Sequence, residues 1–149
     1  MSKPWETVVA ISDLENRRTL AKILGQFGLD SMCVSTVGQC RELLDKGEVG
    51  LVFCGQFFSD GDYRAVLTAS RQCNEGPSVI LAAVRTPAIT DEAIRLGAFD
   101  QVGIPLRPTD VEWTVIKAQR SRRALAAAHA APRLVAPARQ LENLARHAS

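Results

Sequence analysis

The chain has 149 residues, of which 46% are hydrophobic, so it can bury one sizeable core and we expect a single main domain. No apolar run approaches the roughly 18 to 20 residues that cross a bilayer, and the N-terminal residues lack the long apolar stretch of a secretory signal, which argues against a membrane span and favours a cytoplasmic protein. The formal net charge is only +2, but it is uneven: residues 1–119 carry a net charge of −3 and residues 120–149 one of +5.

Short apolar runs alternate with amphipathic segments along most of the chain. Compact apolar runs favour buried strands, and apolar residues that recur at three- and four-residue intervals favour helices. Gly28 and Gly97 follow two helical segments as C-terminal stops, and Thr90 is expected to cap the fourth helix. The sequence predicts strands over residues 7–11, 31–35, 50–54, 78–83 and 101–104, which alternate with helices over residues 15–27, 37–46, 64–73, 90–96 and from 109 onward.

The last of these helices has an apolar stripe of Val111, Val115 and Ile116, which we expect to face the core. Trp113 falls off that stripe. It is therefore either a core anchor or an exposed contact for a partner, since aromatic anchors are favoured at interfaces. The sequence leaves both interpretations open.

Five apolar strands separated by helices indicate a parallel sheet with helices on both faces. We expect the α/β class: a flavodoxin-like, doubly wound sheet with strand order 2-1-3-4-5 and a helical C-terminal extension. In this topology the ligand crevice lies at the carboxyl ends of the first and third strands. Ser12, Asp13 and Gly55 lie at these two strand ends, so we expect them to meet in the crevice.

Composition changes near residue 120, beyond which the chain is mostly Ala, Arg and Leu. We expect a main domain over residues 1–123 and an Ala/Arg-rich helical tail over residues 124–149. Arg120 and Arg123 are expected to project from the extended last helix as a basic patch. Residues 138–147 favour one more helix, which is too short to be stable alone and has to pack on the domain, a second subunit or a partner.

The sequence offers no recognised set of catalytic or metal-binding residues. The four cysteines show no CxxC spacing, and both histidines, His129 and His147, lie in the tail, which argues against a zinc site, a disulfide scaffold and a Ser/His/Asp triad. Cys54 ends an apolar run and is expected in the core rather than as a nucleophile. No P-loop or GxGxxG pattern is present. We therefore expect no bound metal and no cofactor.

The segment VGLVFCGQFFSDGDY, residues 49–63, contains an apolar strand, a loop and a Gly-bearing turn. It resembles the third strand and following loop of the receiver domains of response regulators in two-component signalling, and GAFDQV followed by Pro105 resembles the approach to their last helix. In that family the position of Gly55 carries the aspartate that accepts the phosphoryl group. Glycine has no side chain, so the resemblance implies a pseudo-receiver, which keeps the scaffold without its phosphoacceptor.

Further positions of the receiver site are changed as well. Receivers end their first strand with a pair of acidic residues that hold Mg²⁺, where this chain has Ser12 and Asp13. They end their fourth strand with a Thr or Ser that contacts the phosphoryl group, where this chain has Ala82 and Ala83. The resemblance therefore implies a degenerate phosphorylation site in which at most one carboxylate of the magnesium pair remains.

The fifth strand differs from the receiver pattern in two places. Receivers end it with Lys-Pro, often joined by a cis bond, where this chain has Ile104-Pro105; we expect that bond to be cis. Gln101 stands where receivers usually have an aromatic residue that changes rotamer when the domain is switched. The resemblance thus implies a domain locked in one conformation, or one governed by something other than phosphate.

Without a phosphate site, function is expected on the surface. We expect a regulatory module that is not an enzyme and that binds a protein partner or a second copy of itself, as a dimer, through the last helix and its extension. Gln101, Trp113, Arg120 and Arg123 are the candidate interaction residues. The alternative is a nucleic-acid-associated regulator whose arginine-rich tail contacts phosphates, although no DNA-binding motif and no base-stacking aromatic residues accompany those arginines.

Overall fold

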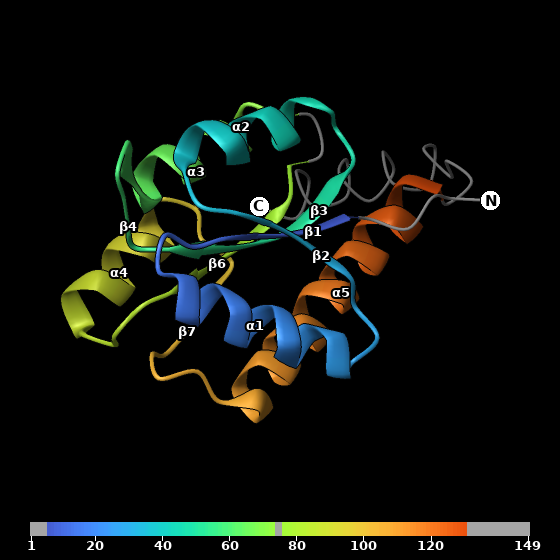
Figure 1. Cartoon of the computed structure of the whole chain (residues 1–149). Coiled ribbons are helices and arrows are strands. Elements are labelled where there is room, and N and C mark those ends of the chain that lie inside the picture. The colour runs from blue at the N-terminus through green and yellow to red at the C-terminus, as the bar shows by residue number, and fades with distance from the viewer. Residues whose placement is uncertain (1–5, 74–75, 131–149) are drawn as a thin grey trace, which may run out of the picture. The chain divides into compact units, whose positions relative to one another are not determined.

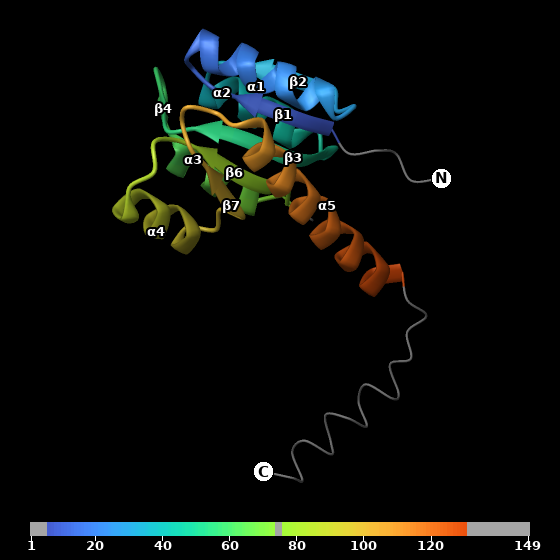
Figure 2. The same cartoon turned by 90° about the horizontal axis from the view of Figure 1, so that it is seen from below.

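The structure is a computed structural model that describes residues 6–73 and 76–130. Five parallel strands form one sheet in the order β2-β1-β3-β6-β7, as predicted (Figures 1 and 2). They are β1 (Glu6–Ala10), β2 (Ser31–Val34), β3 (Val49–Gly55), β6 (Ser78–Ala82) and β7 (Asp100–Val102). The helices are α1 (Leu14–Gln26), α2 (Val37–Asp45), α3 (Tyr63–Arg71), α4 (Pro87–Arg95) and α5 (Pro108–Ala130).

Helices cover both faces of the sheet because its strands are apolar on both sides. On one face, Val8, Val52 and Leu81 pack against α2, α3 and Ala93 of α4. On the other face, Phe53 and Ile80 pack against α1 and the first part of α5 (Figure 1). The fold is therefore the flavodoxin-like, doubly wound sheet that the alternation of strands and helices predicts.

The chain divides into two compact units, Met1–Ala118 and Gln119–Ser149, and α5 begins in the first and ends in the second. In the first unit, α5 buries Val111 and Val115 as expected, whereas Ile116 is only half-buried. The predicted helix over residues 138–147 and most of the predicted tail lie outside the described residues. Among the residues that are described, no helix combines the length and hydrophobicity that crossing a membrane requires.

The start of α4 differs from the prediction. Thr86, not Thr90, is the N-cap: its side chain accepts a hydrogen bond from the amide of Ile89, at 3.3 Å, and Pro87 occupies the first turn, where a missing N–H does no harm. Thr90 lies inside the helix and binds Gln101 instead. The Thr-Pro pair was the correct start signal in the sequence.

A small antiparallel hairpin, absent from the prediction, follows the sheet's third strand. Its strands are β4 (Phe57–Phe58) and β5 (Gly61–Asp62), which pair Phe57 with Asp62 and Phe58 with Gly61. Each strand has only two residues, which is too short for the alternation of apolar and polar residues that marks a strand in a sequence. The hairpin matters because it carries Phe57 to the edge of the candidate site.

Candidate functional site

A pocket of about 590 Å³ lies at the carboxyl ends of the parallel strands. The loops after β1, β3, β6 and β7 all contribute to it, as the topology predicts. It is lined by every residue of the predicted degenerate site: Ser12, Asp13, Gly55, Ala82, Ala83 and Ile104. The fold therefore brings together six residues that are spread over more than ninety positions of the sequence.

Gly55 is the last residue of β3 and pairs with Ala82 of β6. Its backbone does not adopt a positive φ, so the conformation does not require glycine. A Cβ atom built there would lie 3.5 Å from Cα and 3.6 Å from Cγ2 of Ile11, which is ordinary van der Waals contact. A Cβ atom would therefore fit at this position without displacing its neighbours.

Asp13 is the only acidic residue among the described residues that line the pocket, and its carboxylate accepts a hydrogen bond from the backbone. It caps α1, because its Oδ2 accepts a hydrogen bond from the amide of Asn16 at 2.8 Å. Arg17 fixes the same loop by donating from Nη1 to the carbonyl oxygens of Ile11, at 2.7 Å, and Ser12, at 3.2 Å. The loop after β1 is thus built as a helix cap.

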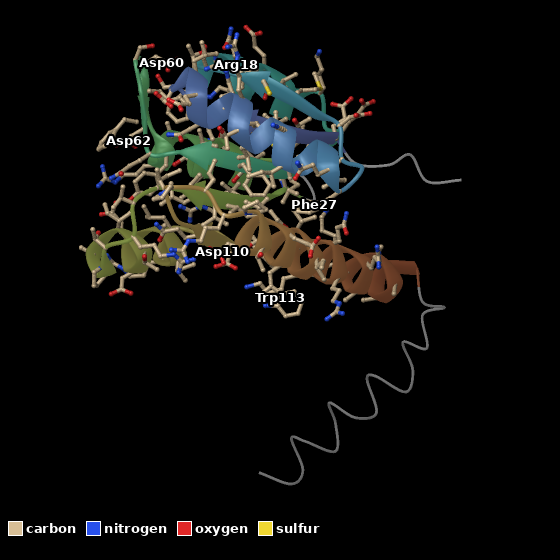
Figure 3. The ribbon with its side chains drawn as sticks, turned by 60° about the horizontal axis from the view of Figure 1, so that its bottom comes forward. Arg18, Phe27, Asp60, Asp62, Asp110 and Trp113 are labelled. Atoms are coloured by element: carbon tan, nitrogen blue, oxygen red, sulfur yellow. The ribbon has the colours of Figure 1, made fainter. Side chains whose placement is uncertain are left out.

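The two aspartates of the hairpin have structural roles of the same kind. Asp60 accepts hydrogen bonds from the amides of Val37 and Gly38 at the start of α2, both at 2.9 Å. These backbone bonds, that from Gly38 first, lower the pKa of the Asp60 carboxyl. Asp62 caps α3 by accepting from the amide of Arg64. Figure 3 labels both residues on the hairpin, and neither lines the pocket.

The part of the pocket wall that the ends of β6 and β7 form is hydrocarbon. The Ile104-Pro105 bond is cis, as predicted, and Ile104 lines the pocket beside Ala82 and Ala83. No lysine or arginine is among the described lining residues. Cys54, next to Gly55, is fully buried, and that burial raises the pKa of its thiol well above the ordinary value, so the core interpretation of this cysteine is confirmed.

Three exposed apolar side chains stand at the pocket and were not anticipated as site residues. They are Leu14 at the start of α1, Phe57 of β4 and Val84 after β6, with exposures of 48%, 70% and 60%. Phe57 is exposed because the two adjacent residues of β4 point to opposite faces and Phe58 is the buried one, which the sequence alone does not reveal. Val84 gave no sequence signal either, because it lies in the loop after β6.

Gln101 lies inside the protein, with a side chain that is only 3% exposed. Its Nε2 donates to the carbonyl of Ala83 at 3.2 Å, and its Oε1 accepts from the hydroxyl of Thr90 on α4. Its own carbonyl accepts from Nη2 of Arg85 at 3.3 Å. Gln101 therefore ties β7 to α4 and to the loop at the pocket, and presents no side chain to a partner.

A second set of contacts ties α4 to α3. Glu92 accepts a hydrogen bond from the hydroxyl of the buried Tyr63 and lies 2.8 Å from Nε and 2.7 Å from Nη2 of Arg64. Burial first, and the bond to Glu92 second, raise the pKa of Tyr63 to about 12. The bond from Tyr63 is also the main cause that lowers the pKa of Glu92.

Trp113 is not a core anchor, since it is 58% exposed on the outer side of α5 (Figure 3), and its contact with a partner stays a prediction. Nearby on the same helix, Nζ of Lys117 lies 2.6 Å from Oδ2 of Asp100 on β7. In the second unit, Arg120 and Arg123 are exposed. Of the four candidate interaction residues, three are on the surface and Gln101 is not.

No protein-family model matches the sequence, and no curated protein matches it. Several solved structures are similar to the chain. A fusion that includes part of the yeast Spc42 trimeric coiled coil has 23% identity and a TM-score of 0.75 over 100% of both chains. The signal receiver domain of an HD domain-containing protein from Pseudomonas fluorescens has 19% identity and a TM-score of 0.73, over 83% of this chain and 95% of that one.

The chemotaxis response regulator CheY4 of Vibrio cholerae is a third similar structure. It has 11% identity and a TM-score of 0.70, and the similarity covers 78% of this chain and 99% of that chain. Several other solved receiver domains resemble the chain to a similar degree. The chain therefore has a receiver-like fold.

Proposed function

We propose that this chain is a receiver-like regulatory module that acts through protein contacts, without phosphorylation of an aspartate and without enzymatic activity. One observation carries the proposal: the pocket that unites the six predicted site residues is floored by Gly55, Ala82 and Ala83 and walled by Ile104. The receiver-like fold supports the signalling class, since solved structures of this fold include response regulators.

The chemistry of the pocket supports the absence of phosphoryl transfer. Transfer to a carboxylate needs a nucleophile, a divalent cation and fixed positive charge where negative charge develops. Gly55 offers no nucleophile, and Ile104 offers no charge. Asp13 is a single carboxylate engaged in a helix cap, whereas Mg²⁺ requires several oxygen ligands in a nearly octahedral arrangement.

The contacts of α4 support a domain that does not switch. A switch needs two conformations of similar free energy. Here α4 is held by Thr90 to the buried amide of Gln101 and by Glu92 to Tyr63 and Arg64 of α3. Moving α4 would break both sets of hydrogen bonds and leave the buried amide unsatisfied, which is unfavourable.

The surface of α5 is the proposed contact region. Trp113 is a large exposed aromatic residue, and side chains of this kind contribute much of the binding energy at protein interfaces. The partner is a protein, and a second copy of the chain is included in the proposal. The replacement Trp113→Ala removes the aromatic ring from an exposed position and should leave the fold intact.

The test is affinity capture from the native cell with the full chain. We expect partners captured by the wild type to be lost or reduced at least tenfold with Trp113→Ala and kept with Met32→Ala, a control at another exposed apolar residue. Sedimentation of the same proteins measures self-association. Equal capture and equal self-association by the wild type and Trp113→Ala would contradict the proposed contact region.

The second candidate function, nucleic-acid binding, is favoured by the exposure of Arg120 and Arg123. Contacts to phosphates release counterions, so binding of this kind weakens steeply as salt rises. Salt-dependent binding that is lost when residues 120–149 are removed would support it. No binding of duplex DNA or of RNA at low salt would exclude it.

A further inference from the structure

We infer that the pocket at the strand ends binds a small molecule that has an apolar part and carries no negative charge. This is a different ligand class from the phosphoryl group and Mg²⁺ that the resemblance places at the corresponding site of receivers. The inference concerns the pocket alone and does not depend on the protein contact proposed for α5.

The rim of the pocket is the first argument. Among the described residues, seven large apolar side chains are exposed, and three of them, Leu14, Phe57 and Val84, line this one pocket. They come from three separate parts of the chain: a helix start, a hairpin strand and a loop. Single exposed apolar residues need no explanation, but a group around a concave site marks a surface for an apolar ligand.

The floor is the second argument. Gly55, Ala82 and Ala83 have little or no side chain, so they leave the pocket open, and Ile11 and Ile104 add hydrocarbon to its walls. The volume of about 590 Å³ falls within the range of pockets that hold small molecules. The apolar rim and floor favour a ligand with an apolar part, and the neutral polar side chains of Ser12, Asn16 and Gln56 also line the pocket.

The charge of the pocket lining is the third argument, because a single negative charge disfavours the binding of an anion. Asp13 is the only charged residue among the described lining residues, and the other polar ones, Ser12, Asn16 and Gln56, are neutral. The N-terminus of α1 would otherwise attract an anion, but the Asp13 carboxylate already caps it. Arg17 directs its guanidinium to the carbonyls of Ile11 and Ser12, and is not part of the lining.

The first experiment titrates the full chain with N-phenylnaphthylamine, an uncharged naphthalene dye, by fluorescence and calorimetry. We expect saturable binding of one dye per chain. Phe57→Ser and Val84→Ser each remove exposed apolar area at the rim, so each should weaken binding about tenfold. Ile94→Ser is the matched control, because Ile94 is as exposed as Leu14 but does not line the pocket, and it should leave the affinity unchanged.

The second experiment tests the charge selection with anilinonaphthalene sulfonate, the anionic analogue of that dye. It should bind the wild type more weakly than the uncharged dye does. Asp13→Asn keeps a capping side chain but removes the charge, so it should raise the affinity for the sulfonate, relative to that for the uncharged dye, about three- to tenfold. Inorganic phosphate should displace neither dye.

Several results would overturn the inference. One is equal dye binding by the wild type and both rim variants, each shown to be folded by its thermal unfolding transition. Others are displacement of the dye by phosphate, or an affinity for the sulfonate, relative to that for the uncharged dye, that Asp13→Asn does not change. If instead the rim variants change only the sedimentation of the protein, the rim is a contact between copies of the chain and the ligand inference is wrong.

Discussion

The hydroxyl of Thr90 on α4 donates a hydrogen bond to the side-chain oxygen of Gln101 on β7. The rest of that amide is also satisfied, since its Nε2 donates to the carbonyl of Ala83 beside the pocket. A buried amide with partners at both ends fixes the relative positions of the three elements that provide them. This contact is the physical basis of the proposal that the domain holds one conformation.

The first prediction concerns that contact. Thr90→Val keeps the shape of the side chain but leaves Oε1 of Gln101 without its donor, so the free energy of unfolding should fall by about 1 to 3 kcal/mol. Thr90→Ser keeps the hydroxyl, so its free energy of unfolding should fall much less. Urea unfolding of the three proteins measures the difference, and equal stability of the Val and Ser variants would show that the bond contributes nothing.

The second prediction concerns Tyr63, the single tyrosine of the chain, which makes its ionisation directly measurable by absorbance. Its pKa is raised to about 12, from the ordinary value of 10.0, by burial and by the bond to Glu92. A raised pKa means that the protonated hydroxyl stabilises the fold below pH 10, and that this contribution is lost as the pH rises toward 12.

Glu92→Gln provides the test, since it removes the negative charge beside the tyrosine and keeps a hydrogen-bond acceptor. The titration midpoint of Tyr63 should fall but stay above 10.0, because burial is the larger cause. An unchanged midpoint would mean that Glu92 doesn't act on the tyrosine. A wild-type midpoint near 10.0 would mean that the hydroxyl is not buried as the structure has it.

The third prediction is the pH dependence that Asp60 confers. The amides of Gly38 and Val37 lower its pKa below the ordinary value of 3.8. A lowered pKa means that the carboxylate stabilises the fold at pH values above 3.8, and that this contribution disappears as the pH falls through the folded-state pKa. Asp60→Asn should therefore have a lower free energy of unfolding than the wild type at neutral pH. The difference between the two proteins should become smaller in acid.

Urea unfolding of the wild type and of Asp60→Asn at acid and neutral pH measures that difference in the free energy of unfolding. Asp91→Asn, at an exposed carboxyl of α4, controls for the loss of one negative charge. A difference in free energy of unfolding that stays constant with pH would contradict the helix-capping role of Asp60.

The fourth prediction follows from the space at Gly55. Since a Cβ there makes only ordinary contacts and the backbone φ is not positive, Gly55→Ala should change the free energy of unfolding by between zero and a gain of about 1 kcal/mol. Thermal unfolding is the measurement. A clear loss of stability would show that the glycine is kept for packing, and would remove the argument that the position could hold a side chain.

The order of the sheet and the membership of the pocket could be predicted because they rest on strong local signals. Apolar runs mark the strands, and the topology then places Ser12, Gly55 and Ile104 at one edge. The cis bond before Pro105 was predicted from the resemblance to receivers. None of these predictions needed the conformation of an individual side chain.

The contacts between distant side chains could not be predicted. Asp60 caps a helix that begins 23 residues earlier, and Glu92 meets Tyr63 29 residues away, so no local pattern contains either pair. Gln101 has the sequence appearance of a polar surface residue and becomes internal only because Thr90 and Ala83 satisfy its amide. Such pairings depend on the packed tertiary structure.

The central claim is that this receiver-like domain accepts no phosphoryl group. Incubation of the full chain with acetyl phosphate and Mg²⁺, followed by intact-mass measurement, tests it most directly, with a variant that combines Ser12→Asp, Gly55→Asp, Ala82→Thr and Ile104→Lys for comparison. We predict no mass increase for the wild type and an acid-labile phosphoryl adduct on the variant. An acid-labile adduct on the wild type would contradict the account.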